Sequence, residues 1–195
     1  MEHEYEFKWA AAGPRDFEVF LRALKTLARA GRPSARKIKD VYFDSASKYY
    51  SRNKIACRMR NENGKFFLTL KCASKIVKGL AERPELDFKL KSQTSAAAEK
   101  EMTKFLPDKN IKKIFTISNE RTVYKIKKIF EAEVCLDDFV INSGGKTRRM
   151  REIEMELKNG PKNIFKTFAR KVSRRAKLKF AKISKMKTAL LMAKV

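Results

Sequence analysis

Acidic side chains stand at every second position in two short segments of the sequence. Glu4 and Glu6 form the first series, and Glu152, Glu154 and Glu156 form the second. Residues two apart on a β-strand point to the same face and lie about 7 Å from each other. Carboxylates held this close repel one another unless a cation or a set of basic groups compensates their charge. The spacing therefore indicates a site for a cation or for paired bases on one face of a sheet.

Basic side chains follow the same alternation in other segments. Because Arg58, Arg60 and Lys71 lie on faces of this kind, we expect them to crowd positive charge on one inward face. Removing one of them should then relieve repulsion without lowering the stability of the fold. The charged positions that alternate with apolar residues outside the two acidic series are Lys8, Arg58, Arg60, Lys71, Arg83, Glu85 and Asp87.

A charged face on one strand usually lies in solvent, but five strands with nearly pure acidic or basic faces favour another arrangement. Closing the sheet into a barrel of about eight strands places these faces inside, with room for a ligand. The apolar faces then pack outward against helices. Carboxylate oxygens select Mg²⁺ or Mn²⁺, and Arg and Lys match phosphate oxygens. Phosphoryl transfer depends mostly on positioning and charge neutralisation, so the pattern requires no Ser, Cys or His nucleophile.

Hydrophobic periodicity predicts the elements that carry these residues. Asn63-Gly64 predicts a hairpin, and residues 142–145 predict a second turn. No Pro/Gly/Ser-rich linker divides the chain, so residues 1–195 are expected to form a single α+β domain with two strand-helix-strands halves. Strands are predicted over 4–9, 40–44, 55–60, 66–71, 82–90, 120–129, 131–140 and 149–158, and helices over 16–30, 96–106, 161–177 and 183–193.

The charge of the chain is strongly positive, with 47 Lys and Arg against 22 Asp and Glu and a formal net charge of +25. A surplus of this size implies a polyanionic partner: a nucleic acid, a phosphate-rich metabolite or an anionic membrane. Residues 161–195 carry 12 Lys and Arg and no acidic residue. Their spacing gathers bases on one face of a helix, which is either a solvated face or a docking surface for long polyphosphate.

Several classes of protein are disfavoured by composition. His3 is the only histidine, which argues against a His-based triad or zinc site. Cys57, Cys72 and Cys135 lack metal-ligand spacing and indicate free thiols in a reducing cytoplasm. No apolar run approaches the roughly 20 residues that cross a bilayer, and the first residues do not resemble a signal peptide. We therefore expect a cytoplasmic protein that does not bind a membrane.

Short motifs with these charged residues recur along almost the whole chain. They are Glu4-Tyr5-Glu6-Phe7-Lys8, Val41-Tyr42-Phe43-Asp44-Ser45, Cys57-Arg58-Met59-Arg60, Leu68-Thr69-Leu70-Lys71, Arg83-Pro84-Glu85-Leu86-Asp87, Glu120-Arg121-Thr122-Val123-Tyr124, Leu136-Asp137, Arg151-Glu152-Ile153-Glu154-Met155-Glu156-Leu157 and Ser184-Lys185. In their order, these motifs resemble those of the CYTH family, the triphosphate tunnel metalloenzymes.

The resemblance implies an eight-stranded antiparallel β-barrel that forms a tunnel, with helices packed on its outside. It also implies a Mg²⁺ or Mn²⁺ ion and catalytic roles for Glu4, Glu6, Lys8 and Glu85. The metal ligands that it implies are Glu4, Glu6, Asp137, Glu152 and Glu154, with Glu85 assisting. The phosphate-binding residues that it implies are Lys8, Arg58, Arg60, Lys71, Arg83, Arg121 and Lys185.

Some positions depart from the family pattern or leave alternatives open. Asn119 replaces the first Lys of a Lys-x-Arg strand, and Cys135 lies where some relatives carry an Asp. Glu133 and Glu156 either join the site or lie in solvent. Arg83 either binds phosphate or pairs with Asp87. Asp44 is expected to be structural, and Trp9 to belong to the core outside the barrel.

The family covers several activities that share the tunnel and the metal. Inorganic triphosphatase is the simplest, followed by hydrolysis of nucleoside triphosphates. Thiamine triphosphatase and class IV adenylate cyclase are alternatives, although the His-Phe pair typical of the cyclases does not precede Glu4. A non-catalytic module that binds polyphosphate or nucleic acid is the alternative from another class. Nucleic acid is disfavoured because no exposed aromatic-plus-basic motif is recognisable.

Overall fold

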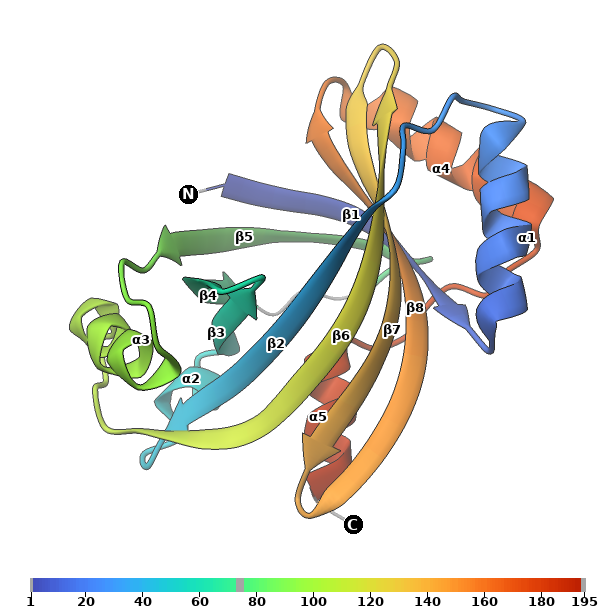
Figure 1. Cartoon of the computed structure of the whole chain (residues 1–195). Coiled ribbons are helices and arrows are strands. Elements are labelled where there is room, and N and C mark those ends of the chain that lie inside the picture. The colour runs from blue at the N-terminus through green and yellow to red at the C-terminus, as the bar shows by residue number, and fades with distance from the viewer. Residues whose placement is uncertain (1, 73–75, 194–195) are drawn as a thin grey trace.

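The computed structural model describes residues 2–72 and 76–193, and its eight antiparallel strands form one closed barrel (Figure 1). The strand order around the barrel is β1-β5-β4-β3-β2-β6-β7-β8. The predicted fold class, an α+β eight-stranded barrel with helices around it, is therefore confirmed. The strands are β1 (Glu2–Ala11), β2 (Ser34–Ser45), β3 (Ile55–Glu62), β4 (Lys65–Cys72), β5 (Leu80–Lys89), β6 (Ile111–Lys127), β7 (Glu131–Ser143) and β8 (Lys146–Asn159).

Helices cover two sides of the barrel, and the C-terminal helix fills part of its interior. In Figure 1, α1 and α4 lie together on one side, and α2 and α3 lie on the opposite side. No helix in the described part of the chain is long and apolar enough to cross a membrane. The helices are α1 (Pro14–Lys25), α2 (Tyr49–Arg52), α3 (Ser95–Met102) with a 3-10 turn at Thr103–Phe105, α4 (Lys162–Ala176) and α5 (Lys185–Ala193).

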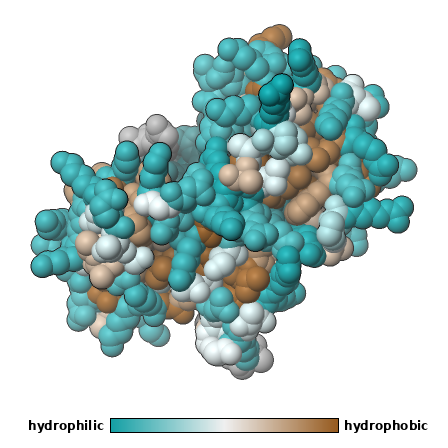
Figure 2. All heavy atoms as spheres, in the orientation of Figure 1, coloured by the Kyte–Doolittle hydropathy of each residue, from teal (hydrophilic) through white to brown (hydrophobic). Residues whose placement is uncertain are grey.

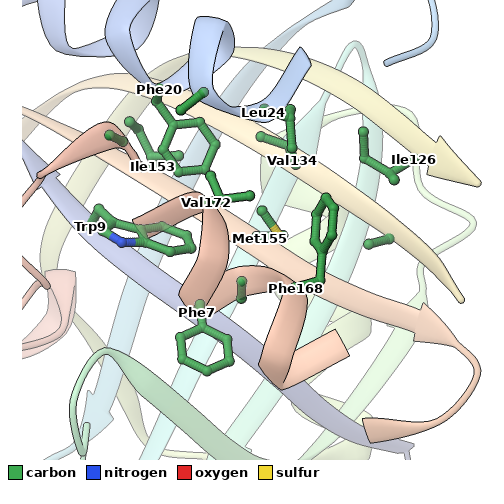
Figure 3. Packing of buried hydrophobic residues seen from close by; sticks show 14 of the residues in the cluster. Phe7, Trp9, Phe20, Leu24, Ile126, Val134, Ile153, Met155, Phe168 and Val172 are labelled. Atoms are coloured by element: carbon green, nitrogen blue, oxygen red, sulfur yellow. The ribbon is translucent and has the colours of Figure 1, made fainter. Parts of the chain in front are cut away.

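The main hydrophobic core lies outside the barrel, between its wall and helices α1 and α4 (Figure 3). Trp9 is fully buried there, with its ring centroid 4.9 Å from that of Phe20 on α1. Its indole nitrogen donates a hydrogen bond to Ser173 Oγ on α4, at 3.0 Å. The prediction that Trp9 faces away from the barrel interior is confirmed. Burial of these outward apolar faces leaves the charged faces to line the interior.

Tight turns fix the register of two hairpins. Asn63 and Gly64 both have positive φ, 49° and 84°, as a two-residue hairpin turn requires. Gly144 and Gly145, with φ of 56° and 73°, make the corresponding turn between β7 and β8. Both turns lie where the sequence predicts them, and the second aligns the acidic faces of β7 and β8.

The strands extend beyond the predicted ranges where alternation fades. Strand β2 begins at Ser34 instead of residue 40, and β6 begins at Ile111 instead of residue 120. These two strands pair from Ser34 to Ser45, with one register shift between Tyr42 and Phe43, so backbone hydrogen bonds define them where exposed lysines replace apolar residues. The first helix ends at Lys25 instead of residue 30, and the single turn of α2 has too few residues to show a period.

Candidate active site

Strand register brings the two acidic series and Lys8 to the same part of the interior. Lys8 pairs with Glu154 across β1 and β8, and Asp137 pairs with Glu152 across β7 and β8. Lys8 and Glu154 line a cavity of about 250 Å³ inside the barrel, whereas the predicted ligands Glu6, Asp137 and Glu152 do not line it and contact the lysines that do. A larger hollow of about 530 Å³ lies on the outer surface, but none of the predicted site residues lines it. The predicted residues that line the inner cavity are Glu4, Lys8, Arg58, Arg60, Lys71, Arg83, Glu85, Arg121, Glu154 and Lys185.

The ammonium group of Lys8 is surrounded by three carboxylates. Its Nζ lies 2.6 Å from Glu154, 3.0 Å from Glu6 and 3.4 Å from Glu152. Burial lowers the pKa of Lys8, but the three carboxylates outweigh it and hold this pKa well above its ordinary value. Lys8 is therefore a fixed positive charge at the centre of the acidic series.

A second ammonium group enters the interior from helix α5. Lys185 Nζ lies 2.6 Å from Asp137, 2.8 Å from Glu154 and 3.4 Å from Glu152. Arg121 completes the cluster, with Nε 2.6 Å from Asp137 Oδ1 and one terminal nitrogen 2.5 Å from Glu154 Oε2. The Lys185 charge also lies 4.9 Å from the centre of the Phe139 ring. Residues from three strands and a helix thus meet at Glu154.

Beyond Phe139, apolar side chains fill the interior beside α5. The rings of Tyr42 and Phe115 stack with centroids 4.3 Å apart, and Ala189 of α5 packs in the same cluster. Ser143 Oγ donates a hydrogen bond to the Ala189 carbonyl at 2.8 Å, which ties α5 to β7. The polar cavity therefore ends against an apolar floor that includes α5.

A third group of charges surrounds Glu4. Arg83 Nε lies 2.5 Å from one oxygen of Glu4, and Lys71 Nζ lies 2.8 Å from the other. Lys71 also lies 2.9 Å from Glu85, and Arg83 lies 3.0 Å from Glu6. The alternative in which Arg83 pairs with Asp87 is therefore wrong: the β1–β5 register places Glu4 directly opposite Arg83.

Arg58 and Arg60 share a carboxylate that the sequence analysis did not single out. Asp40 on β2 lies 3.3 Å from Arg58 and 2.8 Å from Arg60. The expectation that Arg58, Arg60 and Lys71 crowd unbalanced positive charge is therefore wrong, because each has a carboxylate partner. Alternation along 40–44 places Asp40 on the face of Tyr42 and could have indicated it.

Asp44 does not join Asp40 in the interior. A register shift between Tyr42 and Phe43 turns the end of β2, and Asp44 Oδ1 accepts hydrogen bonds from the backbone N–H groups of Ser45 and Tyr50. Asp44 therefore holds the start of α2, which agrees with the structural role expected for it.

The buried carboxylates fall into two sets with opposite pKa shifts. Burial, with smaller contributions from Glu4 and Glu154, raises the pKa of Glu6 to about 7 against the opposing effect of Lys8 and Arg83. Burial also raises the pKa of Glu152. For Glu4 and Glu154 the basic partners outweigh burial and lower the pKa. The site therefore contains carboxylates that stay ionised at neutral pH beside others that hold a proton more readily.

The geometry agrees with comparisons against known proteins. The CYTH domain model matches residues 2–190. The chain belongs to the CYTH family. An inorganic triphosphatase from Haemophilus influenzae is 31% identical over 126 residues, which cover 62% of this chain and 36% of that protein. The chain thus spans about a third of the length of this curated relative.

Two solved structures have the same CYTH-like fold. One is a Hippeastrum protein described as a putative adenylyl cyclase with a dominant triphosphatase activity; its TM-score is 0.72 at 18% identity, over 97% of this chain and 96% of that chain. The other is PH1819 from Pyrococcus horikoshii OT3, with a TM-score of 0.63 at 20% identity, over 98% of this chain and 99% of that chain. At these identities the likeness shows the fold alone.

The two departures from the CYTH pattern both lie in the interior. Asn119 is 7% exposed, lines the cavity, and has a buried Oδ1 atom without a hydrogen-bond partner among the described residues. Burial raises the pKa of the Cys135 thiol to about 12, so this position adds no negative charge. Glu133 and Glu156 do line the cavity, where Glu133 lies 3.6 Å from Arg36 and Glu156 lies 2.6 Å from Lys158.

The donor chemistry of this CYTH site suits a hard divalent cation, although the carboxylates are engaged with bases. Within residues 2–72 and 76–193, no group of three or more His, Cys, Asp or Glu side chains is arranged so that it could hold a metal ion. Instead Lys8 and Lys185 each lie among three carboxylates. Carboxylate oxygens are the ligands that Mg²⁺ and Mn²⁺ prefer, so the donor atoms of these residues are of the type that such an ion binds.

Proposed function

We propose that this chain is a single-domain, metal-dependent triphosphatase that hydrolyses inorganic triphosphate to diphosphate and phosphate. The observation that supports this most directly is the meeting of Lys8, Arg121 and Lys185 on one carboxylate, Glu154, inside the barrel. Such a cluster offers fixed positive charges for phosphate oxygens and hard oxygens for a cation in one place. The relatives named triphosphatases support the same activity.

In this proposal the basic side chains bind the substrate. Arg58, Arg60, Lys71 and Arg83 would hold phosphate oxygens from one wall, and Lys8, Arg121 and Lys185 from the other. Each base is already oriented by a carboxylate, so little side-chain entropy remains to be lost on binding. Seven convergent cations would also stabilise the negative charge that the phosphoryl group carries in the transition state.

The acidic side chains would hold a Mg²⁺ or Mn²⁺ ion in the same proposal. Glu4, Glu6, Glu152, Glu154 and Asp137 are the candidate ligands, and Glu85 is a candidate to assist through its contact with Lys71. The ion, when bound, would neutralise phosphate charge and lower the pKa of a bound water. Without it, the carboxylates would repel a polyanion, which disfavours a module that binds polyphosphate without turnover.

The size of the cavity favours a phosphate chain that carries no organic group. Its volume of about 250 Å³ is below the range of about 300–1,000 Å³ found for sites that enclose drug-sized ligands. Inorganic triphosphate is therefore the proposed substrate, and nucleoside triphosphates come next. The free thiols of Cys57, Cys72 and Cys135 support a cytoplasmic location.

A phosphate-release screen tests the proposal. Tripolyphosphate, ATP, thiamine triphosphate and long polyphosphate are each incubated with Mg²⁺, with Mn²⁺ or with EDTA. We expect the highest kcat/KM with tripolyphosphate and no release in EDTA. Full turnover in EDTA, or no release from any substrate, would refute the proposal. Cyclic nucleotide and diphosphate formed from ATP would identify a cyclase instead.

A further inference from the structure

The net positive charge of the chain lies outside its active site, because acids balance the bases in the interior. Nine Lys and Arg line the interior, and ten Asp and Glu lie there with them. The side chains that the structure describes, which leave out Glu2, Lys75 and Lys194, include 45 bases and 21 acids, so 36 bases and 11 acids lie elsewhere. The interior acids are Glu4, Glu6, Asp40, Glu85, Asp87, Glu133, Asp137, Glu152, Glu154 and Glu156, and the interior bases are Lys8, Arg36, Arg58, Arg60, Lys71, Arg83, Arg121, Lys158 and Lys185.

The excess of basic over acidic side chains outside the barrel is larger than solubility requires. A net charge of about 2 to 8 keeps a small domain soluble, and a much larger charge of one sign destabilises the fold through self-repulsion. A triphosphate bound inside the barrel cannot account for a surplus on its outer surface. Figure 2 shows hydrophilic residues over most of the visible face. A polyanion bound outside would compensate the repulsion.

Helix α4 carries six Lys and Arg and no acidic residue. Its apolar side, with Phe165, Phe168 and Val172, is buried against the barrel and α1. Residues 161–195 contain no acidic residue, so no carboxylate from this segment compensates its bases. In the described part of the chain, four exposed bases of α4 form no ion pair with a carboxylate: Arg170, Lys171, Arg174 and Arg175. The helix dipole interacts favourably with Arg174 and Arg175 in the last turn, but it does not explain the other two.

Helix α4 begins close in the sequence to a base that lines the cavity. Lys158 on β8 lines the cavity, and α4 begins four residues later at Lys162. A chain lying along α4 could therefore enter the barrel by way of Lys158.

The chemistry of the exposed surface favours a polymer without bases. Single-stranded RNA is held by aromatic side chains on which its bases stack, together with basic groups. Among the described residues, Phe105 is the one large exposed aromatic side chain, and it follows α3 on the other side of the barrel from α4 (Figure 1). Inorganic polyphosphate needs cations alone, and its terminal units have the same anhydride chemistry as triphosphate.

We propose that the exposed basic face of α4, formed by Arg170, Lys171, Arg174 and Arg175, binds long inorganic polyphosphate while the end of that chain occupies the barrel. The inference rests on the proposed triphosphatase function. In each turnover water attacks the terminal phosphorus, the terminal P–O–P bond breaks, and orthophosphate and one proton leave while the shortened chain stays bound to α4.

A charge-matched pair of variants tests the surface. In the first, Arg170, Lys171, Arg174 and Arg175 are all changed to Gln. In the second, the exposed Lys100, Lys104, Lys109 and Lys112, in the α3–β6 region, are changed to Gln, which removes the same charge. Binding of labelled long polyphosphate is measured in EDTA, so that no turnover occurs, between about 50 and 200 mM salt.

We expect the α4 variant to bind about tenfold more weakly at low salt. The slope of the logarithm of its binding constant against the logarithm of the salt concentration should be smaller by about three, because each phosphate contact that is lost lowers the number of released counterions by about 0.7–0.9. Its kcat/KM for tripolyphosphate should stay within about twofold of the parent, and the control variant should keep the parent's slope. KM for long polyphosphate should rise in the α4 variant alone.

Three results would overturn the inference. They are parental binding by the α4 variant, an equal loss in the control variant, and RNA binding that is as tight as polyphosphate binding and equally sensitive to the α4 changes. The failure of the proposed triphosphatase function would look different: the parent would release no phosphate from tripolyphosphate, whatever the binding experiment in EDTA shows.

Discussion

The ammonium groups of Lys8 and Lys185 share one carboxylate oxygen, Glu154 Oε1, at distances of 2.6 Å and 2.8 Å. Lys8 belongs to the first strand of the barrel, and Lys185 belongs to the last helix. The two ends of the chain are therefore joined through β8 at the centre of the candidate site. This relationship makes α5 part of the site and not only its floor.

Changing Lys185 to Gln should affect both catalysis and the anchoring of α5. Loss of a charge-assisted contact of about 1.5–3 kcal/mol should lower kcat/KM for tripolyphosphate at least tenfold. Amide hydrogen exchange in α5 should also become faster, since Lys185 holds the start of this helix to Asp137 and Glu154. Lys187→Gln is the matched control, because Lys187 is exposed on the same helix. Equal effects of the two changes would contradict the assignment.

Changing Lys71 to Ala should lower activity and stability together. The sequence alone suggested that this change relieves repulsion, but Lys71 lies 2.8 Å from Glu4 and 2.9 Å from Glu85. Its removal leaves the buried Glu4 and the half-buried Glu85 short of a partner, so the free energy of unfolding should fall by about 1–3 kcal/mol. The value of kcat/KM should drop at least tenfold. Lys71→Arg should restore most of the stability in a urea titration, and an unchanged midpoint for Lys71→Ala would show that the contacts are dispensable.

Changing Glu154 to Gln should weaken metal binding while the fold persists. Glu154 contacts Lys8, Arg121 and Lys185, so its loss should destabilise the protein by about 3 kcal/mol. Titration calorimetry of EDTA-treated protein with Mn²⁺ should show at least tenfold weaker binding, and turnover should fall at least a hundredfold.

The control for Glu154 is Glu131→Gln on the neighbouring strand. Glu131 is about half exposed and pairs with Lys127 at the surface, so its loss should cost less than about 1 kcal/mol and leave Mn²⁺ binding unchanged. Parental Mn²⁺ affinity in Glu154→Gln would remove Glu154 from the ligand set.

Alternation in the sequence was sufficient to predict which faces of the strands line the interior. Glu4, Glu6 and Lys8 point inward and Trp9 points outward, because side chains alternate with a period of two. Alternation cannot predict which residues meet across strands. The contact of Lys8 with Glu154 depends on the β1–β8 register, which aligns residues 146 positions apart.

Other parts of the site required the three-dimensional fold. Asp40 meets Arg58 and Arg60 only because β2 pairs with β3, and the register shift after Tyr42 separates Asp40 from Asp44. Lys185 lies on a helix whose short apolar pattern gives no orientation, so its place in the interior followed from the family resemblance alone. Local periodicity thus predicted faces, while closure of the barrel determined the ion pairs.

Glu6 should make the stability of the metal-free protein depend on pH between about 4.5 and 7. Its pKa is raised from 4.5 to about 7 by burial first and by Glu4 and Glu154 next. In this window the folded protein keeps a proton that the unfolded chain has released, so stability falls as pH rises and levels off above pH 7. Glu4 and Glu154, whose pKa values are lowered, act below this window, where stability is lost as pH falls.

The change Glu6→Gln isolates this contribution. In EDTA, the decline in the free energy of unfolding between pH 5 and pH 8 should be smaller in the variant, by about 1.4 kcal/mol for each unit of the pKa shift. Glu152, whose pKa burial also raises, should leave a residual decline. Glu82→Gln is the control, because Glu82 lies at the surface in a pair with Lys162. With Glu6 as a metal ligand, as proposed, the ion would displace its proton, so the Mn²⁺ affinity of the parent should increase as pH rises towards 8. A pH profile that is the same in the parent and Glu6→Gln would show that Glu6 ionises normally and that another group carries the dependence.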